Sequence, residues 1–350
     1  MTHRIDLRSD TVTLPTPAMR RAMYEAEVGD DVWGEDPTVV RLQELAAERM
    51  GKEAALFVPS GTMGNLVSLL AHCQRGHEVI LGSECHIFIY EVGAAAVFGG
   101  LIYHIVPTTR FGELPPDEIR GAVRGPNLHF PPTGLICLEN THNRCGGTVV
   151  SPAYMAQVRE IADQHKLPVH LDGARIFNAA LALGVDVREI ARHVDSVMFC
   201  LSKGLSAPVG SLVCGSKAFV ERAHRMRKMA GGAMRQVGVL AAAGIVALSE
   251  MVDRLADDHA NARRLAEGLA EIPGLAVDLE TVQTNMVMLY PTDPRWTTET
   301  LNAALAAAGV LTSYLGRTKM RAVTHYGIAR EDIEEALRVT ARVVREGPGA

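Results

Sequence analysis

Short apolar runs alternate with helical sequence patterns from about residue 54 to residue 215. The runs occupy residues 54–60, 77–83, 101–107, 134–140, 167–173 and 196–202. Helical spacing occurs between them, for example in GTMGNLVSLLAHCQRG (61–76). A strand with one wet face would alternate apolar and polar residues, whereas these runs are almost continuously apolar. The alternation therefore predicts an α/β fold with a mostly parallel sheet that is covered by helices on both faces.

The regions on either side of this alternation have a different character. Residues 1–37 are typical of an N-terminal arm, with turn sequences around one short helix. Residues from about 237 to 271 have the spacing of one long helix. The tail then alternates strand-like and helix-like segments, namely TNMVMLY, TETLNAALAAAG, KMRAVTHYG and REDIEEALRVTARVVRE. We expect an arm at 1–37, a large domain at 38–271 that includes the linking helix, and a small C-terminal α/β domain at 272–350.

The net charge, the N-terminal sequence and the cysteines argue against several classes of protein. A formal charge of -5 with six lysines argues against a nucleic-acid-binding protein, which normally carries a basic surface. The N-terminus MTHRIDLRSD is unlike a signal peptide, and no apolar run reaches the ~18 residues of a membrane span. The six cysteines form no CxxC pair, and His142 with Cys145 lacks a second pair at ligand spacing. We expect a cytoplasmic protein with reduced thiols, no metal, and neither nucleic-acid nor membrane partners.

The sequence VPSGTMGN (58–65) joins an apolar run to a helical pattern. In an open α/β sheet this turn lies at the carboxyl edge, where ligands bind. The N–H groups of the helix N-terminus favour a phosphate, Ser60 and Thr62 add hydroxyl donors, and Gly61 permits close approach of the backbone. An ordinary helix cap would use the same residue types. The GK[ST] ending of a Walker loop is missing, and no GxGxxG occurs in a strand–helix context.

Two further apolar runs end in residues that can carry chemistry. Asp172 ends the run in VHLDGARIF, and Lys203 follows the run in MFCLSKGLSAPVGS. A right-handed βαβ unit would bring both side chains to one sheet edge. A lysine for a Schiff base, a carboxylate for a ring nitrogen and a helix end for a phosphate together match pyridoxal phosphate. Taken singly, Asp172 could instead cap the next helix, and Lys203 could be a solvated surface lysine of a non-catalytic phosphate-binding protein.

With these residues in view, the sequence resembles the low-specificity L-threonine aldolases. These are fold-type-I pyridoxal-phosphate enzymes of the aspartate aminotransferase superfamily. The resemblance implies a large domain with a seven-stranded type of sheet and a small C-terminal domain. It covers about nine-tenths of the chain and rests on motifs in the family's order: DLRSDTVT, GDDVWGEDPTV, PSGTMGN, ENTHN, HLDGARIFNA, CLSKGLSAPVGS, RKMAGGAMRQ and MRAVTH.

The resemblance implies roles for residues around the cofactor. Lys203 would form the Schiff base with pyridoxal 5'-phosphate, and Asp172 would pair with the pyridine nitrogen. His86, in SECHIFIYE, would stack on the ring. The remaining cofactor-binding residues implied are Ser60, Gly61 and Thr62 at the phosphate, Arg175 on the ring-hydroxyl side, and Arg235.

The resemblance also implies residues that bind the substrate. Ser9 and Arg321 would hold the substrate carboxylate, because a guanidinium suits bidentate carboxylate binding. His142, in ENTHN, would approach the substrate hydroxyl. The other substrate-binding residues implied are Trp33, Tyr90, Arg175 and Lys228. Trp33 stands where the family commonly has tyrosine, and the position of Tyr90 varies in the family. Lys228 and Arg235 belong to a segment that reaches toward the active site of a second chain.

The activity implied is reversible cleavage of L-threonine, L-allo-threonine and related β-hydroxy-α-amino acids to glycine and an aldehyde. The base that takes the hydroxyl proton could be His86, His142 or a water that they hold. The implied assembly is a homo-oligomer, a dimer of dimers with shared active sites. The alternative is a β-eliminating, tryptophanase-like lyase of the same fold. Sequence does not choose between the threo and allo substrates, or between a dimer and a tetramer.

Overall fold

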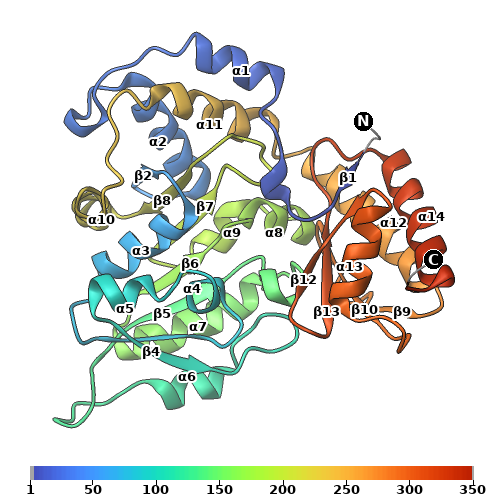
Figure 1. Cartoon of the computed structure of the whole chain (residues 1–350). Coiled ribbons are helices and arrows are strands. Elements are labelled where there is room, and N and C mark those ends of the chain that lie inside the picture. Colours follow the sequence, from blue (N-terminus) through green and yellow to red (C-terminus); the bar gives the residue numbers. More distant parts are fainter. Residues whose placement is uncertain (1–3, 349–350) are drawn as a thin grey trace.

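A seven-stranded sheet forms the centre of the larger lobe in the computed structural model, which describes residues 4–348 (Figure 1). The strand order is β2-β8-β7-β6-β5-β3-β4, and neighbours pair in parallel except that β8 is antiparallel to β2 and β7. The prediction of a mostly parallel sheet is confirmed. The strands are β2 (Ala54–Val58), β3 (Glu78–Gly82), β4 (Ile102–Val106), β5 (Thr133–Glu139), β6 (Val169–Asp172), β7 (Ser196–Cys200) and β8 (Ser211–Gly215).

Helices cover both faces of this sheet. In β5, Ile136 and Leu138 pack into the core on one face, whereas Leu135 and Cys137 pack into the core on the other. Such a strand has no wet face, which explains its continuous apolar sequence. The first face is covered by α2 (Pro37–Met50), α6 (Pro116–Ala122), α7 (Pro152–His165), α8 (Ile176–Leu183) and α9 (Val187–Ala191). The second face is covered by α3 (Gly61–His72), α4 (His86–Ile89), α5 (Ala94–Gly99) and α10 (Lys217–Met229).

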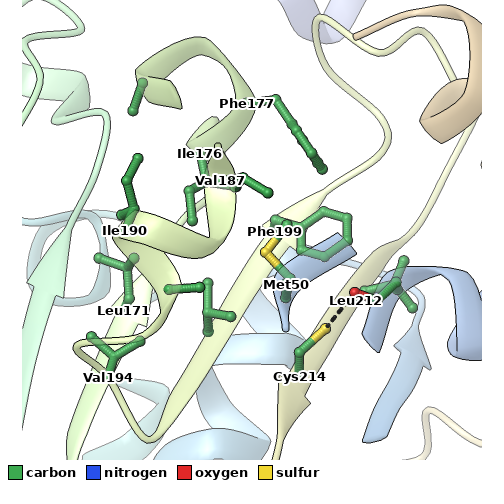
Figure 2. Close-up of a cluster of buried hydrophobic side chains, with 14 of the residues drawn as sticks. Met50, Leu171, Ile176, Phe177, Val187, Ile190, Val194, Phe199, Leu212 and Cys214 are labelled. Carbon is green, nitrogen blue, oxygen red and sulfur yellow. Dashed lines mark hydrogen bonds between the residues drawn. The ribbon is translucent and has the colours of Figure 1, made fainter. Parts of the chain in front are cut away.

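Figure 2 shows part of the core on the first face. Phe177 of α8 meets Phe199 of β7 edge to face, with ring centroids 5.4 Å apart. Ile190 of α9 and Leu171 of β6 belong to the same buried cluster, and Figure 2 shows the α8–α9 turn lying over the sheet. The packing of α8 and α9 on β6 and β7 holds these two strands in place. The residues at their carboxyl ends therefore lie on a rigid base.

The smaller lobe contains a four-stranded antiparallel sheet in the order β12-β13-β10-β9. Its strands are β9 (Leu275–Val277), β10 (Met286–Pro291), β12 (Ser313–Leu315) and β13 (Lys319–Val323). Its helices are α12 (Leu255–Ala270), α13 (Thr298–Ala307) and α14 (Arg330–Glu346). The strands and helices expected in the tail are therefore present, although α12 also belongs to the core of this lobe.

One prediction about the helices is wrong. The single helix expected over 237–271 is two helices, α11 (Gly238–Glu250) and α12, separated by residues 251–254. The helix α11 packs on α1 (Pro17–Tyr24) and α2 in the large lobe, whereas α12 packs on α14, β9 and β10 in the small lobe. Because the two apolar faces belong to different cores, the chain has to turn between them.

The N-terminal arm links the lobes. The strand β1 (Ile5–Asp6) pairs in parallel with β11 (Val310–Leu311) of the small lobe, where Figure 1 shows the blue strand among the red elements. The 3-10 helix η1 (Asp10–Val12) follows, and α1 then lies against α11. The described residues contain two more 3-10 helices, η2 (Asp31–Trp33) and η3 (Asn143–Cys145). Between residues 4 and 348, no helix is both long and apolar enough to cross a membrane.

Candidate active site

The carboxyl ends of β5, β6 and β7 meet at the edge of the large sheet that faces the small lobe. Glu139 and Asp172 are the last residues of β5 and β6 and are register partners, while Lys203 follows β7 by three residues. A cavity of about 260 Å³ lies here, between the arm and the two lobes. Its walls contain Ser9, Thr11, His86, Tyr90, Asn143, Arg175, Lys203, Ser313, Leu315 and Arg321.

Lys203 sits in a loop that the arm helps to hold. Thr13 Oγ1 donates a hydrogen bond of 2.9 Å to the Lys203 carbonyl oxygen, and the backbone N–H of Ser206 donates one of 2.8 Å to the same oxygen. Ser206 has a positive φ of 64°, so the loop turns sharply three residues after the lysine. The backbone of Lys203 is thus fixed while its side chain lines the cavity.

Asp172 is buried and hydrogen-bonded through both oxygens. Its Oδ2 accepts from Asn65 Nδ2 at 2.8 Å, and its Oδ1 accepts from the backbone N–H of Ala174 at 3.1 Å. The N-cap of the following helix is Arg175, so Asp172 is not that helix's capping residue. Its carboxylate closes a local turn instead and retains lone pairs for a further donor.

His86 and Glu91 form a pair beside Asp172. His86 Nδ1 lies 2.9 Å from Glu91 Oε1, and the backbone N–H of His86 donates to Glu139 Oε2 at 2.7 Å. Burial disfavours the charged ring, but the hydrogen bond to Glu91 and the surrounding carboxylates outweigh it and raise the pKa of His86. Burial also raises the pKa of Glu91. Ligand atoms of His86, Glu91 and Asp172 lie within 4.8 Å of one another, a spacing compatible with a cation as well as with this hydrogen-bonded network.

Arg175 is paired with Asp10 of the arm. Its Nε and Nη2 donate to the two Asp10 oxygens at 2.7 and 2.6 Å, and both side chains are buried. Burial would raise the pKa of the Asp10 carboxyl, yet Arg175 holds that pKa well below its usual range. The positive charge of Arg175 is therefore compensated inside the protein, and two of its three nitrogens are occupied.

Arg321 of β13 differs from Arg175 in its hydrogen-bond partners. Its Nη1 donates to Asn143 Oδ1 at 2.6 Å and its Nη2 to the Arg8 carbonyl oxygen at 3.2 Å, so both acceptors are neutral. Its Nε is buried, with no hydrogen-bond partner in the described part of the chain. Burial lowers the pKa of Arg321, and so does the neighbouring Arg175. A partly buried guanidinium whose hydrogen bonds run to neutral oxygens, in a cavity wall, suits an anionic ligand.

Ser9 and Tyr90 both lie in the cavity wall, as expected of substrate-binding residues. Ser9 Oγ accepts from the backbone N–H of Thr11 at 3.2 Å, which leaves its own hydroxyl hydrogen available. Arg144 Nη1 donates to the Tyr90 hydroxyl at 2.9 Å and is itself paired with Glu84. The Tyr90 ring is therefore anchored from outside the cavity.

His142 does not lie in the cavity wall, although the sequence predicts it there. Its side chain is almost fully buried, with Nε2 4.0 Å from Glu139 Oε2 and Nδ1 without a partner among the described residues. A Cβ placed on Gly112 would come within 3 Å of the His142 side chain, so the ring packs under that glycine. The next residue, Asn143, lines the cavity instead. The role expected of His142 at the substrate hydroxyl stays a prediction, and His86 is the histidine in the wall of this cavity.

The loop expected to bind phosphate begins α3. Ser60 Oγ accepts from the backbone N–H of Met63 at 3.2 Å, so Ser60 is the helix cap. A Cβ on Gly61 would lie 2.8 Å from Cys200 Sγ, so a larger residue would collide with the end of β7. Ser60 and Thr62 are solvent-exposed, and neither lines the 260 Å³ cavity. Both hydroxyls lie at the N-terminus of a helix, the arrangement that binds phosphate elsewhere.

Three expected site residues lie away from this cavity. Trp33 is 75% exposed at the end of η2, and Lys228 is exposed on α10. Arg235 Nη1 lies 2.8 Å from Asp30 Oδ2. The resemblance assigns two of them to a segment that serves a second chain, which a single chain does not test.

Sequence reasoning missed residues that the structure brings to the site. Asn65 and Glu91 lie inside the motifs PSGTMGN and SECHIFIYE, and Asp10 lies inside DLRSDTVT. Asn143 directly follows His142. The available signal was a polar residue in an otherwise apolar helix, because Asn65 precedes Leu66, Val67 and Leu69 and is itself fully buried.

Comparisons with known proteins identify the family of this chain. Residues 6–292 match the family described as beta-eliminating lyase. A probable low-specificity L-threonine aldolase 2 from Arabidopsis thaliana is 51% identical over 337 residues, which cover 95% of each chain. The chain belongs to the beta-eliminating lyase family. A low specificity L-threonine aldolase from Escherichia coli (strain K12) is 45% identical over 331 residues, 95% of this chain and 96% of that protein. The resemblance found in the motifs is confirmed.

Solved structures show the same fold. A threonine aldolase from Leishmania major has a TM-score of 0.82 at 20% identity and covers 97% of this chain and 99% of its own. A serine palmitoyltransferase from Sphingomonas wittichii has a TM-score of 0.79 at 17% identity and covers 98% of this chain and 88% of its own. At these identities the likeness establishes the fold that family members share, which is the fold type I predicted from the motifs.

Proposed function

We propose that the protein is a carbon–carbon lyase that uses pyridoxal 5'-phosphate. It cleaves L-threonine, L-allo-threonine and related β-hydroxy-α-amino acids to glycine and an aldehyde, and the reaction is reversible. One observation carries the proposal: Lys203, His86 and Arg321 line one cavity, with Asp172 directly behind His86. The names of the relatives at 45% and 51% identity support the same reaction.

The residues at the sheet edge fit the cofactor. Lys203 offers an amine to its aldehyde, and the N-terminus of α3, with Ser60, Gly61 and Thr62, offers donors to its phosphate. Asp172 is buried and accepts only one N–H on each oxygen in the described structure, so it can hold a proton at a pyridine nitrogen. When bound, the cofactor supplies a sink for the electron pair released at Cα.

The substrate carboxylate is assigned to Arg321. Arg175 is already neutralised by Asp10, whereas both hydrogen bonds of Arg321 run to neutral oxygens. A carboxylate that met the free Nε of Arg321 would satisfy this buried donor and compensate its charge. Ser9 follows Arg8, which accepts from Arg321, and can donate a second hydrogen bond from the cavity wall. These contacts would fix the orientation of Cα above the sheet edge.

His86 is assigned to the hydroxyl proton. Its Nδ1 is occupied by Glu91, which leaves Nε2 as the basic nitrogen once the ring is neutral. Cleavage of Cα–Cβ requires the β-hydroxyl to lose its proton, either to His86 or to a water that His86 holds. His142 lies behind the wall, so its contribution would be to support Asn143 and Glu139. Arg175 would stay on the ring-hydroxyl side of the cofactor.

We also propose that the protein is a cytoplasmic homo-oligomer, a dimer of dimers with shared active sites. Leu14, Tyr24 and Trp33 of the arm are 69%, 90% and 75% exposed, which is apolar surface that a second copy would cover. In the shared site, Trp33, Lys228 and Arg235 would serve the partner. Light scattering would give the assembly. Mixing a Lys203→Ala chain with an Arg235→Ala chain should restore part of the activity, and no recovery in proven mixed oligomers would contradict sharing.

One assay separates the proposed reaction from its alternative. Purified protein is incubated with L-threonine, L-allo-threonine and L-phenylserine, and glycine and aldehyde are measured. A β-eliminating, tryptophanase-like lyase, which the family description also covers, would release ammonia and a keto acid from L-tryptophan or L-serine instead. Glycine and aldehyde in equal amounts support the aldolase. Ammonia without glycine would overturn it.

A further inference from the structure

Asn65 joins the two carboxylates behind the cavity. Its Nδ2 donates to Asp172 Oδ2 at 2.8 Å and to Glu91 Oε1 at 2.7 Å. Asn65 is fully buried, and only 2% of Asp172 and 4% of Glu91 is exposed. Both amide hydrogens are therefore used on carboxylates. The amide oxygen must then accept a hydrogen bond rather than donate one.

A chain of buried polar groups continues from that oxygen, away from the cavity. Asn65 Oδ1 lies 3.1 Å from His170 Nε2, and His170 Nδ1 lies 2.8 Å from Ser196 Oγ. Ser196 Oγ lies 2.7 Å from His72 Nε2. Burial lowers the pKa of His170 to about 3 and that of His72 to about 4. Both imidazoles are therefore neutral near pH 7, and each has one N–H.

One arrangement of hydrogens satisfies every link in this chain. Because Asn65 Oδ1 has to accept, His170 must carry its hydrogen on Nε2 and leave Nδ1 bare. Ser196 must then donate its hydroxyl hydrogen to Nδ1 of His170. The Ser196 oxygen is left to accept, so His72 carries its hydrogen on Nε2. Every donor consequently points toward Asp172 and Glu91, and aligned hydrogen bonds of this kind strengthen one another.

We propose that Asn65, His170 and Ser196 are positioning residues that aim the Asp172 carboxylate at the pyridine nitrogen of the cofactor. This inference rests on the proposed function and extends it to the layer behind the site. The aligned donors stabilise the negative charge without adding a positive one. The Asn65 amide also holds two carboxylates that would otherwise repel each other. The same helix thereby serves the cofactor twice, because its first turn faces the phosphate and Asn65 lies one turn later.

The first test determines which ring nitrogen of each histidine carries the hydrogen. Histidine side chains labelled with ¹⁵N are observed by NMR in the full-length protein, with and without cofactor, and assigned through His170→Gln and His72→Gln. We expect the Nε2–H tautomer at both His170 and His72. In Ser196→Ala, His170 should keep this tautomer because Asn65 Oδ1 still has to accept, whereas His72 loses its partner and should average between the two forms. An Nδ1–H tautomer at His170 in the wild type would overturn the proposed direction of the chain.

The second test measures function and colour. Ser196→Ala removes one neutral hydrogen bond, so we expect kcat to fall about 2- to 10-fold with KM unchanged, since Arg321 holds the substrate. Asn65→Asp removes the donor that bridges the two carboxylates. We therefore expect kcat to fall about 10- to 100-fold, the range for outer-shell partners at metal sites. The visible band of the bound cofactor should also change in both variants, because the proton on its ring nitrogen is held less firmly.

The matched control is Ser68→Ala. Ser68 is a fully buried hydroxyl on the same helix, α3, and it donates only to the Gly64 carbonyl oxygen at 2.7 Å. The Ser68→Ala variant should leave kcat and the visible band of the bound cofactor unchanged. Equal effects of Ser196→Ala and Ser68→Ala would overturn the positioning role. A wild-type protein that neither binds the cofactor nor releases aldehyde would overturn the proposed function instead, and the tautomer measurement would still decide the direction of the chain.

Discussion

The ion pair between Asp10 and Arg175 joins the N-terminal arm to the large lobe, and Asp10→Asn should destabilise the protein strongly. The two N–O distances are 2.6 and 2.7 Å, and the side chains are 0% and 6% exposed. Asparagine preserves the volume but not the charge. The Arg175 guanidinium would then stay buried without its carboxylate partner, and the neighbouring Arg321 would lose the favourable charge of Asp10 as well.

The size of the effect follows from this burial. Breaking a buried ion pair by removing one partner costs about 3–5 kcal/mol of the free energy of unfolding. An exposed ion pair is worth about 0–1 kcal/mol. Asp117 and Arg120 provide such a pair, with an N–O distance of 2.7 Å and Asp117 97% exposed. Asp117→Asn is therefore the matched control, because it makes the same substitution at a similar distance without burial.

The pH dependence has a definite sign. Arg175 holds the pKa of Asp10 below its usual range in the folded protein. Stability from such a group is fully present above the unfolded pKa of about 3.9 and is lost as pH falls toward the folded pKa. The difference between wild type and Asp10→Asn should therefore be constant above about pH 5.

Urea titration of both variants at saturating cofactor gives the free energies of unfolding. A loss below about 1 kcal/mol for Asp10→Asn, equal to the Asp117→Asn control, would refute the reasoning. It would mean that water or a rearranged carboxylate compensates Arg175 in the variant.

The remaining predictions concern the site itself. Lys203→Ala should abolish turnover and the visible band of bound cofactor. Borohydride reduction of the wild type should attach the pyridoxyl group to Lys203, and attachment to any other lysine would contradict the assignment. Asp172→Asn should keep some cofactor but lose about 10²- to 10³-fold in kcat, the range for a preorganised electrostatic group; near-normal turnover would mean that Asp172 only closes its turn. If His86 is the base, kcat/KM rises with pH through its raised pKa, and Glu91→Gln should move that rise to lower pH; an unmoved profile assigns the proton elsewhere. Arg321→Lys should raise KM at least about 10-fold by losing the bidentate grip, and an unchanged KM would exclude Arg321 as the carboxylate site.

The sequence by itself determined the larger lobe and the chemical centre of the site. Continuous apolar runs that alternate with helical spacing can be buried only in a sheet covered on both faces. Parallel strands end at one edge, so Asp172 and Lys203 had to come together once their runs were identified as strands. Both inferences depend only on the hydrophobic pattern within one βαβ unit, and that pattern can be identified from the local sequence.

Only the tertiary structure decided how distant segments complete the site. Asp10 reaches Arg175 because β1 joins β11, more than 300 residues away in the chain, and no periodicity encodes that pairing. The helix expected over 237–271 divides because its two halves pack into separate cores. Asn65 looked like one more residue of an apolar helix, yet its partners on β6 and between α4 and α5 make it the bridge between two carboxylates. Local pattern fixes which residues face inward, whereas the packing of the two lobes fixes which of them meet.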